Sequence, residues 1–150
     1  MKIEKKRIKI GQAEEINFPE LKLSAIPARI DTGAQTSAIW ATVIDEQDGI
    51  LGFVLFDSDS PYYSGVMHKT RNYEKRKIVS SIGNIEQRYV VKLLIELKGR
   101  KIRASLSLAN RSRQVYPMLV GRNVLRGKFV VDVKHGQPIV KKKQQISGKL

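Results

Sequence analysis

Apolar and polar residues alternate along several short segments of the chain, and this period of two is typical of β-strands with one buried face. The clearest segment spans residues 102–108, in which apolar Ile102, Ala104, Leu106 and Leu108 alternate with polar Arg103, Ser105 and Ser107. Residues 87–97 show the same alternation, and Gly99 separates the two segments. The pattern therefore predicts two successive half-buried strands joined by a tight turn.

Other short apolar segments are bounded by Gly, Pro, Ser or Asn, the residues that favour turns. They predict further strands at residues 7–10, 28–30, 37–43, 51–56, 76–79, 118–120 and 128–133. The predicted strands on either side of residues 80–86 would form a long hairpin with its turn at Gly83-Asn84, residues 57–65 a loop, and residues 122–126 one or two helical turns. Many short strands without a long amphipathic helix predict an all-β barrel or sandwich.

The chain length of 150 residues corresponds to one domain. We expect a single domain over residues 1–140 and a basic, flexible tail over residues 141–150. No apolar run approaches the roughly 18 residues of a membrane span, and the basic N-terminus leads into no apolar signal region. These features predict no membrane contact and, with the lack of cysteine, favour a cytoplasmic location.

Composition also narrows the possible chemistry. There are no cysteines, which removes thiolate nucleophiles, disulfides and zinc fingers. The only histidines, His68 and His135, lie far apart, so we expect no metal site and no cofactor. Lys and Arg number 28 against 14 Asp and Glu, and the resulting charge of +14 attracts acidic partners such as nucleic acid or anionic peptide.

The first candidate for chemistry is Asp31-Thr32-Gly33-Ala34, which follows the predicted strand 28–30. An aspartate that leaves a strand into a glycine turn presents its carboxylate on a rigid base, and Gly33 lets the backbone approach that carboxylate closely. The hydroxyl of Thr32 can lock the loop. The same residue types also form ordinary turns between strands, so the tetrapeptide alone does not decide between a catalytic and a structural role.

Two further segments accompany this tetrapeptide. The predicted hairpin can close over a cleft and exclude water. Near the end of the chain, the predicted strand 118–120 ends at Gly121, followed by Arg122 and Asn123, and a glycine there can pack against another loop without a Cβ in the way. Each segment by itself also fits a plain hairpin or a strand-to-helix turn.

Taken in order, these segments resemble the retropepsin family, the aspartic peptidases of retroviral type. The shared features are the DTGA tetrapeptide, an apolar pair followed by Gly-Arg-Asn at residues 119–123, and a hairpin between the two. A closer resemblance is to a bacterial retropepsin-like family that was first labelled "ATP-dependent zinc protease" and is linked to RimK-type glutamate ligases. It is carried by residues 28–41, by residues 80–83 with Arg88, and by residues 110–133.

Three features of the chain depart from these patterns or from the old label. Many relatives have a histidine at the position of Trp40, and viral enzymes usually carry an acid at the position of Gln35, where it pairs with the later arginine. Arg122 is therefore expected to have a different partner here. The label finds no support in a phosphate-binding loop, because five residues separate Gly121 from Gly127 and Phe129 occupies the hydroxyl position.

The resemblance implies a closed all-β barrel of the retropepsin (acid protease) type with a flap hairpin and one short C-terminal helix. It also implies the site. The expected catalytic residues are Asp31, Thr32 and Gly33, with loop support from Ala34, Leu119, Val120, Gly121 and Arg122, and with the flap at Ser81, Ile82, Gly83 and Asn84.

A single catalytic aspartate implies a homodimer. Peptide hydrolysis by aspartates needs one carboxylate to take a proton from water and one carboxylic acid to polarise the carbonyl group. Asp132 lacks a following Thr-Gly and is interpreted as a structural acid paired with an arginine, so the second group would be Asp31 of another subunit, brought in by a two-fold axis. Ala34 adds no hydroxyl to stabilise the ionised pair, which predicts activity closer to neutral pH than in stomach-type enzymes.

The predicted substrate-binding residues are Arg76, Arg88 and Arg111, because paired hydrogen bonds from arginine suit carboxylates. We expect an acidic peptide or protein substrate, such as the oligoglutamate tail that the link to glutamate ligases implies. Two alternatives stay open: a non-catalytic basic β-barrel that binds RNA or a ribosomal surface, and a peptidase fold that has lost activity and serves as an interaction module.

Overall fold

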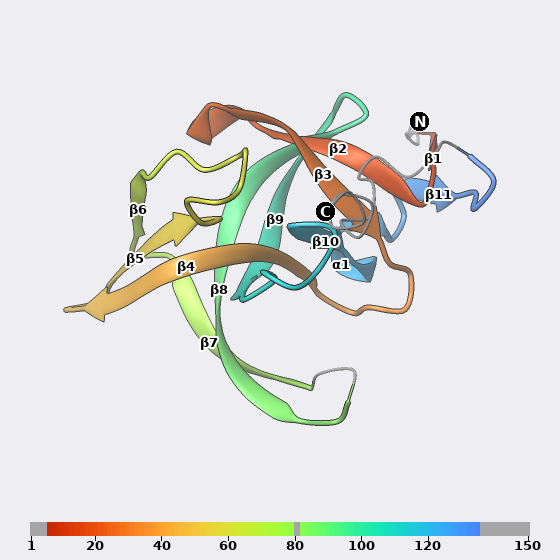
Figure 1. The fold of residues 1–150 in the computed structure, drawn as a ribbon. Coiled ribbons are helices and arrows are strands. Elements are labelled where there is room, and N and C mark those ends of the chain that lie inside the picture. The colour runs from red at the N-terminus through yellow and green to blue at the C-terminus, as the bar shows by residue number, and fades with distance from the viewer. Residues whose placement is uncertain (1–5, 80–81, 136–150) are drawn as a thin grey trace, which may run out of the picture.

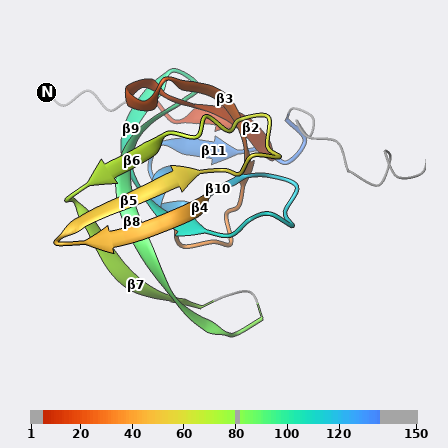
Figure 2. The same cartoon turned by 60° about the vertical axis from the view of Figure 1, so that its left-hand side comes forward.

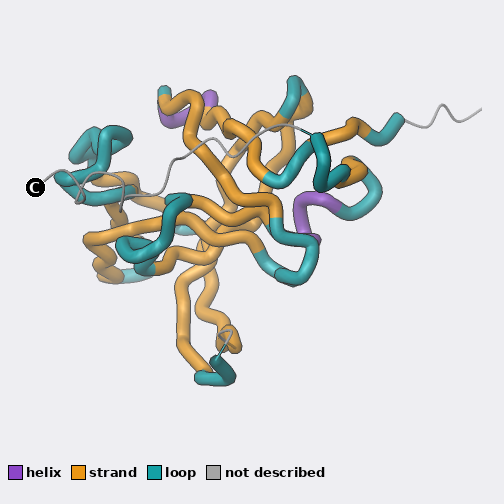
Figure 3. Tube along the Cα trace, turned by 45° about the vertical axis from the view of Figure 1, so that its right-hand side comes forward, coloured by secondary structure: helices purple, strands orange, loops and turns teal. Residues whose placement is uncertain are grey.

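The computed structural model describes residues 6–79 and 82–135. Within these ranges the chain forms strands and two short helices (Figures 1 and 3). In chain order they are β1 (Ile8–Ile10), β2 (Ala13–Phe18), the 3-10 helix η1 (Pro19–Leu21), β3 (Leu23–Ile30), β4 (Ser37–Gln47), β5 (Ile50–Leu55), β6 (Met67–Thr70), β7 (Tyr73–Val79), β8 (Ile85–Leu97), β9 (Arg100–Ala109), β10 (Met118–Val120), α1 (Arg122–Leu125) and β11 (Phe129–Val131).

All the predicted strands are present, and so are the loop at residues 57–65 and the helical turn after Gly121. The predicted strand 28–30 is the end of the longer β3. Two strands were not predicted. In β2 the alternation is hidden because Glu14 is buried, where its Oε2 accepts a hydrogen bond from the Gly11 amide at 2.8 Å. The edge strand β6 buries little of its Met-His-Lys-Thr sequence and so lacks an apolar face.

Six strands close a ring, which confirms the predicted barrel. They follow the order β10-β3-β2-β8-β9-β4, and β10 then pairs with β4 to complete the circle. The pairing of β10 is parallel to β3 and antiparallel to β4. Since closure pairs both edges of these strands, it fixes the positions of the loops that leave them.

Three smaller elements extend this ring. The strands β5 and β6 continue the sheet outward from β4, as Figure 2 shows. The strand β7 pairs with β8 alone, and this hairpin projects from the barrel on the side where the β3–β4 loop lies (Figures 1 and 2). The parallel pair β1–β11 is separate from the large sheet.

The core is apolar and is formed by the strands of the ring together with β5. Its largest fully buried side chains include Phe18, Phe53, Ile39, Ile95 and Leu106. Trp40 is half-buried against this cluster, as expected for a packing residue. None of the helices in residues 6–79 and 82–135 is long and apolar enough to cross a membrane. The predicted limit of the domain and the predicted tail fall outside the described residues.

Candidate active site

Asp31 lies at the carboxyl end of β3, where the neighbouring β10 also ends. The two strands are parallel, with Ile30 opposite Val120. The ladder continues one residue further, because the Asp31 amide donates to the Val120 carbonyl at 2.9 Å. Asp31 itself is half-buried, so its backbone is fixed by the barrel while its side chain stays accessible.

The loop after Asp31 is a tight turn built on the aspartate. The Gly33 amide donates to Asp31 Oδ1 at 2.9 Å, and the Ala34 amide donates to the Asp31 carbonyl at 3.2 Å. A Cβ at Gly33 would lie 3.3 Å from Asp31 Oδ1, which confirms the predicted close approach of backbone to carboxylate. Thr32 and Gly33 are exposed. One carboxylate oxygen is therefore oriented by the backbone of its own loop.

The segment that follows Gly121 is hydrogen-bonded to this loop. The Arg122 amide donates to the Ala34 carbonyl at 2.8 Å, and the Asn123 amide donates to the Gln35 carbonyl at 3.2 Å. The guanidinium of Arg122 donates through Nη1 to the Thr32 carbonyl at 3.1 Å. This carbonyl is the different partner that the sequence predicted for Arg122.

Gly121 lies where the two segments touch. A Cβ at this position would meet the carbonyl oxygens of Thr36 at 2.7 Å and Ala34 at 2.8 Å, distances that real Cβ atoms do not reach. Glycine is therefore required by close approach, and its φ needs no special freedom. Val120 is fully buried and its carbonyl accepts from the Asp31 amide, whereas Leu119 is half-buried and pairs with Arg29 of β3.

A buried serine that the sequence did not single out joins the two segments. Ser37 Oγ accepts from the Gly121 amide at 2.9 Å and donates to Asn123 Oδ1 at 2.8 Å. The Asn123 amide nitrogen in turn donates to the Ser105 carbonyl on β9 at 2.9 Å. Because Ser37 has no exposed surface, its hydroxyl replaces water for a buried backbone group. The alternation of β4 could only indicate that position 37 is buried, not what it bonds.

One basic side chain, Arg111, lies within electrostatic reach of the Asp31 carboxylate. Arg111 is half-buried, and its Nε donates to the Tyr116 carbonyl at 3.0 Å. Burial above all, and then the positive charges of Arg88 and Arg29, lower the pKa of Arg111 to about 10, whereas the Asp31 carboxylate acts in the opposite direction. Arg111 therefore stays charged at neutral pH, within electrostatic reach of Asp31 and of two further arginines.

The three predicted substrate-binding arginines have different surroundings. Arg111 is within electrostatic reach of both Asp31 and Arg88. Arg76 lies opposite Arg88 on the β7–β8 hairpin, and each is paired with a carboxylate two residues before it, Glu74 for Arg76 and Glu86 for Arg88. Arg29 was missed, although it precedes Asp31 by two residues in a strand and so projects from the same face.

The hairpin β7–β8 occupies the place predicted for a flap. Its turn contains Gly83 at φ +86°, as a glycine turn requires. Ile82, Gly83 and Asn84 are exposed, and Ser81 lies outside the described residues. Three large apolar side chains near the tip are mostly exposed: Val79 (66%), Ile82 (81%) and Ile85 (69%). We call these three the flap tip.

Comparison with known proteins supplies the family. The model of a family described as retropepsin-like aspartic endopeptidase RimB, or RimB-like, matches residues 9–143. The chain belongs to the RimB-like family. Its match includes the Asp31 loop, the β7–β8 hairpin and the Gly121 segment together.

Curated relatives of this RimB-like chain carry a different name. A protein of Shewanella halifaxensis called probable alpha-L-glutamate ligase is 36% identical over 127 residues, which cover 82% of this chain and 28% of that protein. A protein of the same name from Desulfotalea psychrophila is 33% identical over 127 residues, covering 82% of this chain and 27% of that protein. The chain thus spans little more than a quarter of the curated relatives it matches.

A solved structure shares the RimB-like fold. It is a Legionella pneumophila protein described as having unknown function, with a TM-score of 0.68 and 26% identity. The match covers 86% of this chain and 95% of that one.

Asp132, which the sequence predicted to be a structural acid, directly follows β11. Its Oδ1 accepts from the Lys134 amide at 3.0 Å, and its carbonyl accepts from the His135 amide at 2.9 Å. It therefore closes a turn after β11. The structural role is as predicted, but the side chain holds a backbone amide where an arginine was expected.

Proposed function

We propose that this chain is an aspartic endopeptidase that acts as a homodimer, with one Asp31 from each subunit. The observation that carries the proposal is the double support of the Asp31 loop. The loop is bonded to β10 by the Asp31 amide and to α1 through the Arg122 and Asn123 amides, while the carboxylate stays accessible. Membership of the RimB-like family agrees with this chemistry.

The reaction needs two carboxyl groups in opposite protonation states. The ionised Asp31 takes a proton from water, whose oxygen attacks the peptide carbonyl carbon, while the protonated Asp31 of the partner subunit donates to the carbonyl oxygen. Collapse of the tetrahedral intermediate then breaks the C–N bond as the amine takes the proton held by the first Asp31, while a hydroxyl of the intermediate returns a proton to Asp31 of the partner subunit. Two carboxyl groups in close contact cannot both be ionised, because their negative charges repel each other. Proximity itself therefore supplies one acid and one base.

Subunit mixing tests the dimer directly. Asp31→Asn removes the proton-accepting carboxylate but keeps its size, and we expect activity to fall at least about a thousandfold. At constant total protein, an equal mixture of wild type and this variant that is allowed to exchange should contain active homodimers as about a quarter of all dimers. Activity per total protein should therefore fall to about a quarter of the wild-type value, whereas a fall only to half would show that each subunit works alone.

Acidic polypeptides are the proposed substrate. Arg111 places positive charge within electrostatic reach of Asp31, and Arg29 and Arg88 lie within electrostatic reach of Arg111. Guanidinium groups bind carboxylates through paired hydrogen bonds. The curated relatives are named as probable glutamate ligases, and chains extended with glutamate would present such carboxylates. Cleavage of an oligoglutamate peptide and of a mixed peptide library should be measured between pH 4 and 8, with Asp31→Asn beside wild type. Equal cleavage of neutral and acidic peptides, without an effect of salt, would contradict the proposed specificity.

A second function, binding of RNA phosphates, is favoured by one observation. A groove of about 530 Å³ is lined by Lys6, Ile8, Lys98, Gly99, Arg100 and Lys101, so most of its lining is cationic. It lies by the β8–β9 turn, at the opposite end of β8 from the flap. Asp31→Asn separates the two functions, because it should remove cleavage and leave the affinity for RNA and its dependence on salt unchanged.

A further inference from the structure

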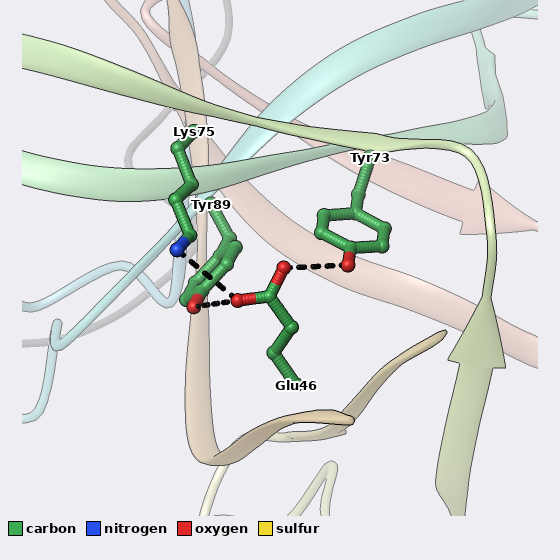
Figure 4. A network of polar contacts seen from close by, with 4 residues as sticks. All are labelled: Glu46, Tyr73, Lys75 and Tyr89. Atoms are coloured by element: carbon green, nitrogen blue, oxygen red, sulfur yellow. Dashed lines mark hydrogen bonds and ion pairs between the residues drawn. The ribbon is translucent and has the colours of Figure 1, made fainter. Parts of the chain in front are cut away.

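At the base of the flap hairpin, the carboxylate of Glu46 interacts with three donor groups. Glu46 Oε2 accepts from the Tyr73 hydroxyl at 2.6 Å, and Oε1 accepts from the Tyr89 hydroxyl at 2.9 Å (Figure 4). The ammonium group of Lys75 lies 3.1 Å from the same Oε1 and 5.4 Å from the centroid of the Tyr89 ring. We call Glu46, Tyr73, Lys75 and Tyr89 the flap-stem network.

This network lies where the flap leaves the barrel. Residues 85–89 of β8 pair with β7 alone, whereas from Val90 onward β8 also pairs with β9. Tyr89 is therefore the last residue of β8 before it joins the barrel wall. Tyr73 and Lys75 lie on the facing strand, with Lys75 directly opposite Tyr89.

Glu46 reaches the hairpin from a different part of the sheet. It lies near the end of β4, opposite Leu51 of β5. Among the described residues no backbone pairing joins β4 to β7. The side chain of Glu46 thus links two hairpins that the backbone leaves separate, and β4 is also the strand that begins just after the Asp31 loop.

Beyond the network, the described part of the flap is a two-stranded ladder that runs from Arg76 opposite Arg88 to Val79 opposite Ile85. A lone pair of strands is marginally stable in water, and the flap tip exposes three large apolar side chains. Such a tip is suited to covering a peptide or the flap of a second subunit. The stem sets the direction in which the hairpin points, because there its side chains bond to Glu46 of β4.

We propose that Glu46 is a positioning residue that fixes the stem of the flap, so that closure over Asp31 bends the hairpin beyond the pair formed by Lys75 and Tyr89. The inference rests on the proposed peptidase function, since it assigns the flap a role in covering the substrate. The charge state of the carboxylate supports it. The hydrogen bond from Tyr73 first, and then those from Tyr89 and Lys75, lower the pKa of Glu46, so the acceptor remains ionised.

Hydrogen exchange of the full chain tests the stem without any substrate. In Glu46→Gln the neutral amide is a weaker acceptor, and amides of residues 73–79 and 85–89 should exchange roughly five- to tenfold faster than in wild type. Glu20→Gln is the matched control, because Glu20 is an exposed carboxylate that receives two hydrogen bonds from Arg103, at 2.8 and 3.2 Å. Unchanged exchange in Glu46→Gln, or the same change in Glu20→Gln, would overturn the proposal.

Hydroxyl deletions keep the test independent of the glutamate substitution. Tyr73→Phe and Tyr89→Phe retain the rings, which lie 6.0 Å apart, and remove one donor each. If the hydroxyls act through Glu46, adding Tyr73→Phe to Glu46→Gln should raise exchange less than the product of the two single effects. Independent, multiplicative effects would show that the carboxylate is not the shared acceptor.

Kinetic measurements test whether the flap stem affects catalysis at Asp31. Glu46→Gln should lower kcat/KM for a peptide about three- to tenfold while leaving the pH limits of the reaction unchanged, because Asp31 is untouched. Faster flap exchange with an unchanged kcat/KM would refute the role in substrate covering. If wild type cleaves no peptide, the peptidase proposal fails, and the exchange data still decide whether Glu46 holds the stem.

Discussion

The Asp31 loop and the flap hairpin are held by opposite means. The loop receives backbone hydrogen bonds from β10 and α1, has the buried Ser37 hydroxyl beneath it, and packs so closely on Gly121 that a methyl group has no room. The hairpin has one strand ladder, an exposed apolar tip and, at its stem, the bonds of Tyr73, Lys75 and Tyr89 to Glu46. The difference teaches that a single chain can combine a carboxylate held by several backbone bonds with a hairpin held by one ladder and a few side chains.

Gly121→Ala should have the largest effect, since its Cβ would meet two backbone carbonyl oxygens rather than a side chain that can turn away. We expect a loss of stability at the upper end of roughly 1–3 kcal/mol, together with displacement of Asp31. Thermal unfolding and peptidase activity measure both. Gly33→Ala is the control, because its Cβ would meet only Asp31 Oδ1, at 3.3 Å, and should disturb activity more than stability.

Ser37→Ala tests the same region by removing a bond without adding bulk. It leaves the buried Gly121 amide without its acceptor and Asn123 without a donor, at a cost of about 1–3 kcal/mol. Ser112→Ala, at an exposed position of the loop before β10, should be neutral. Equal stability of the two variants by denaturant unfolding would show that water replaces the serine hydroxyl.

The variant Arg111→Gln tests whether a residue near the Asp31 loop also determines which peptides are cleaved. Removing the half-buried charge should lower the preference for acidic over neutral peptides about tenfold, since charge-assisted bonds are worth about 1.5–3 kcal/mol. The exposed Arg113 on the same loop provides the control variant Arg113→Gln. The ratio of kcat/KM for matched peptides is the measurement, and a parallel loss in both variants would indicate only a general effect of charge.

Ile82→Ser probes the flap tip, where the expected effects on stability and activity diverge. With 81% of its surface exposed, Ile82 should contribute within about 0.5 kcal/mol to stability. Activity should nevertheless fall, because the tip loses apolar surface that would cover the peptide. A thermal midpoint that drops as far as in Ser37→Ala would contradict this contrast between the closely packed Asp31 loop and the exposed flap tip.

The smallest expected effect is that of acid on the flap stem. Because the folded pKa of Glu46 is lowered from 4.5, its contribution is fully present above its unfolded pKa and is lost as pH falls through the lower folded value. Protection of the stem amides, corrected for intrinsic exchange, should therefore be constant from pH 8 to 5 and decline below about 4. In Glu46→Gln this decline should be absent, and a decline that persists would point to another group.

The sequence was sufficient for the strands with alternating or compact apolar residues, for the β7–β8 hairpin and for the order of the motifs. It failed for β2 and β6. Alternation is visible only when the buried face is apolar, and Glu14 is buried in β2 by a backbone bond and by Lys98, 3.4 Å from its Oε1. In β6 the strand is defined by pairing with β5 rather than by burial.

The sequence by itself determined the all-β class, because alternation of apolar and polar residues is a local signal. The order of its motifs, through their resemblance to retropepsins, indicated the barrel and the carboxylate that carries the proposed chemistry. Only the tertiary structure decided which groups support that carboxylate and the flap stem. Arg122 bonds the Thr32 carbonyl, Ser37 bonds the Gly121 amide, and Glu46 bonds the flap stem. These contacts join residues far apart in the chain, and no local pattern records them. The first two arise because ring closure brings β3, β4 and β10 together, and the third because the end of β4 contacts the β7–β8 hairpin.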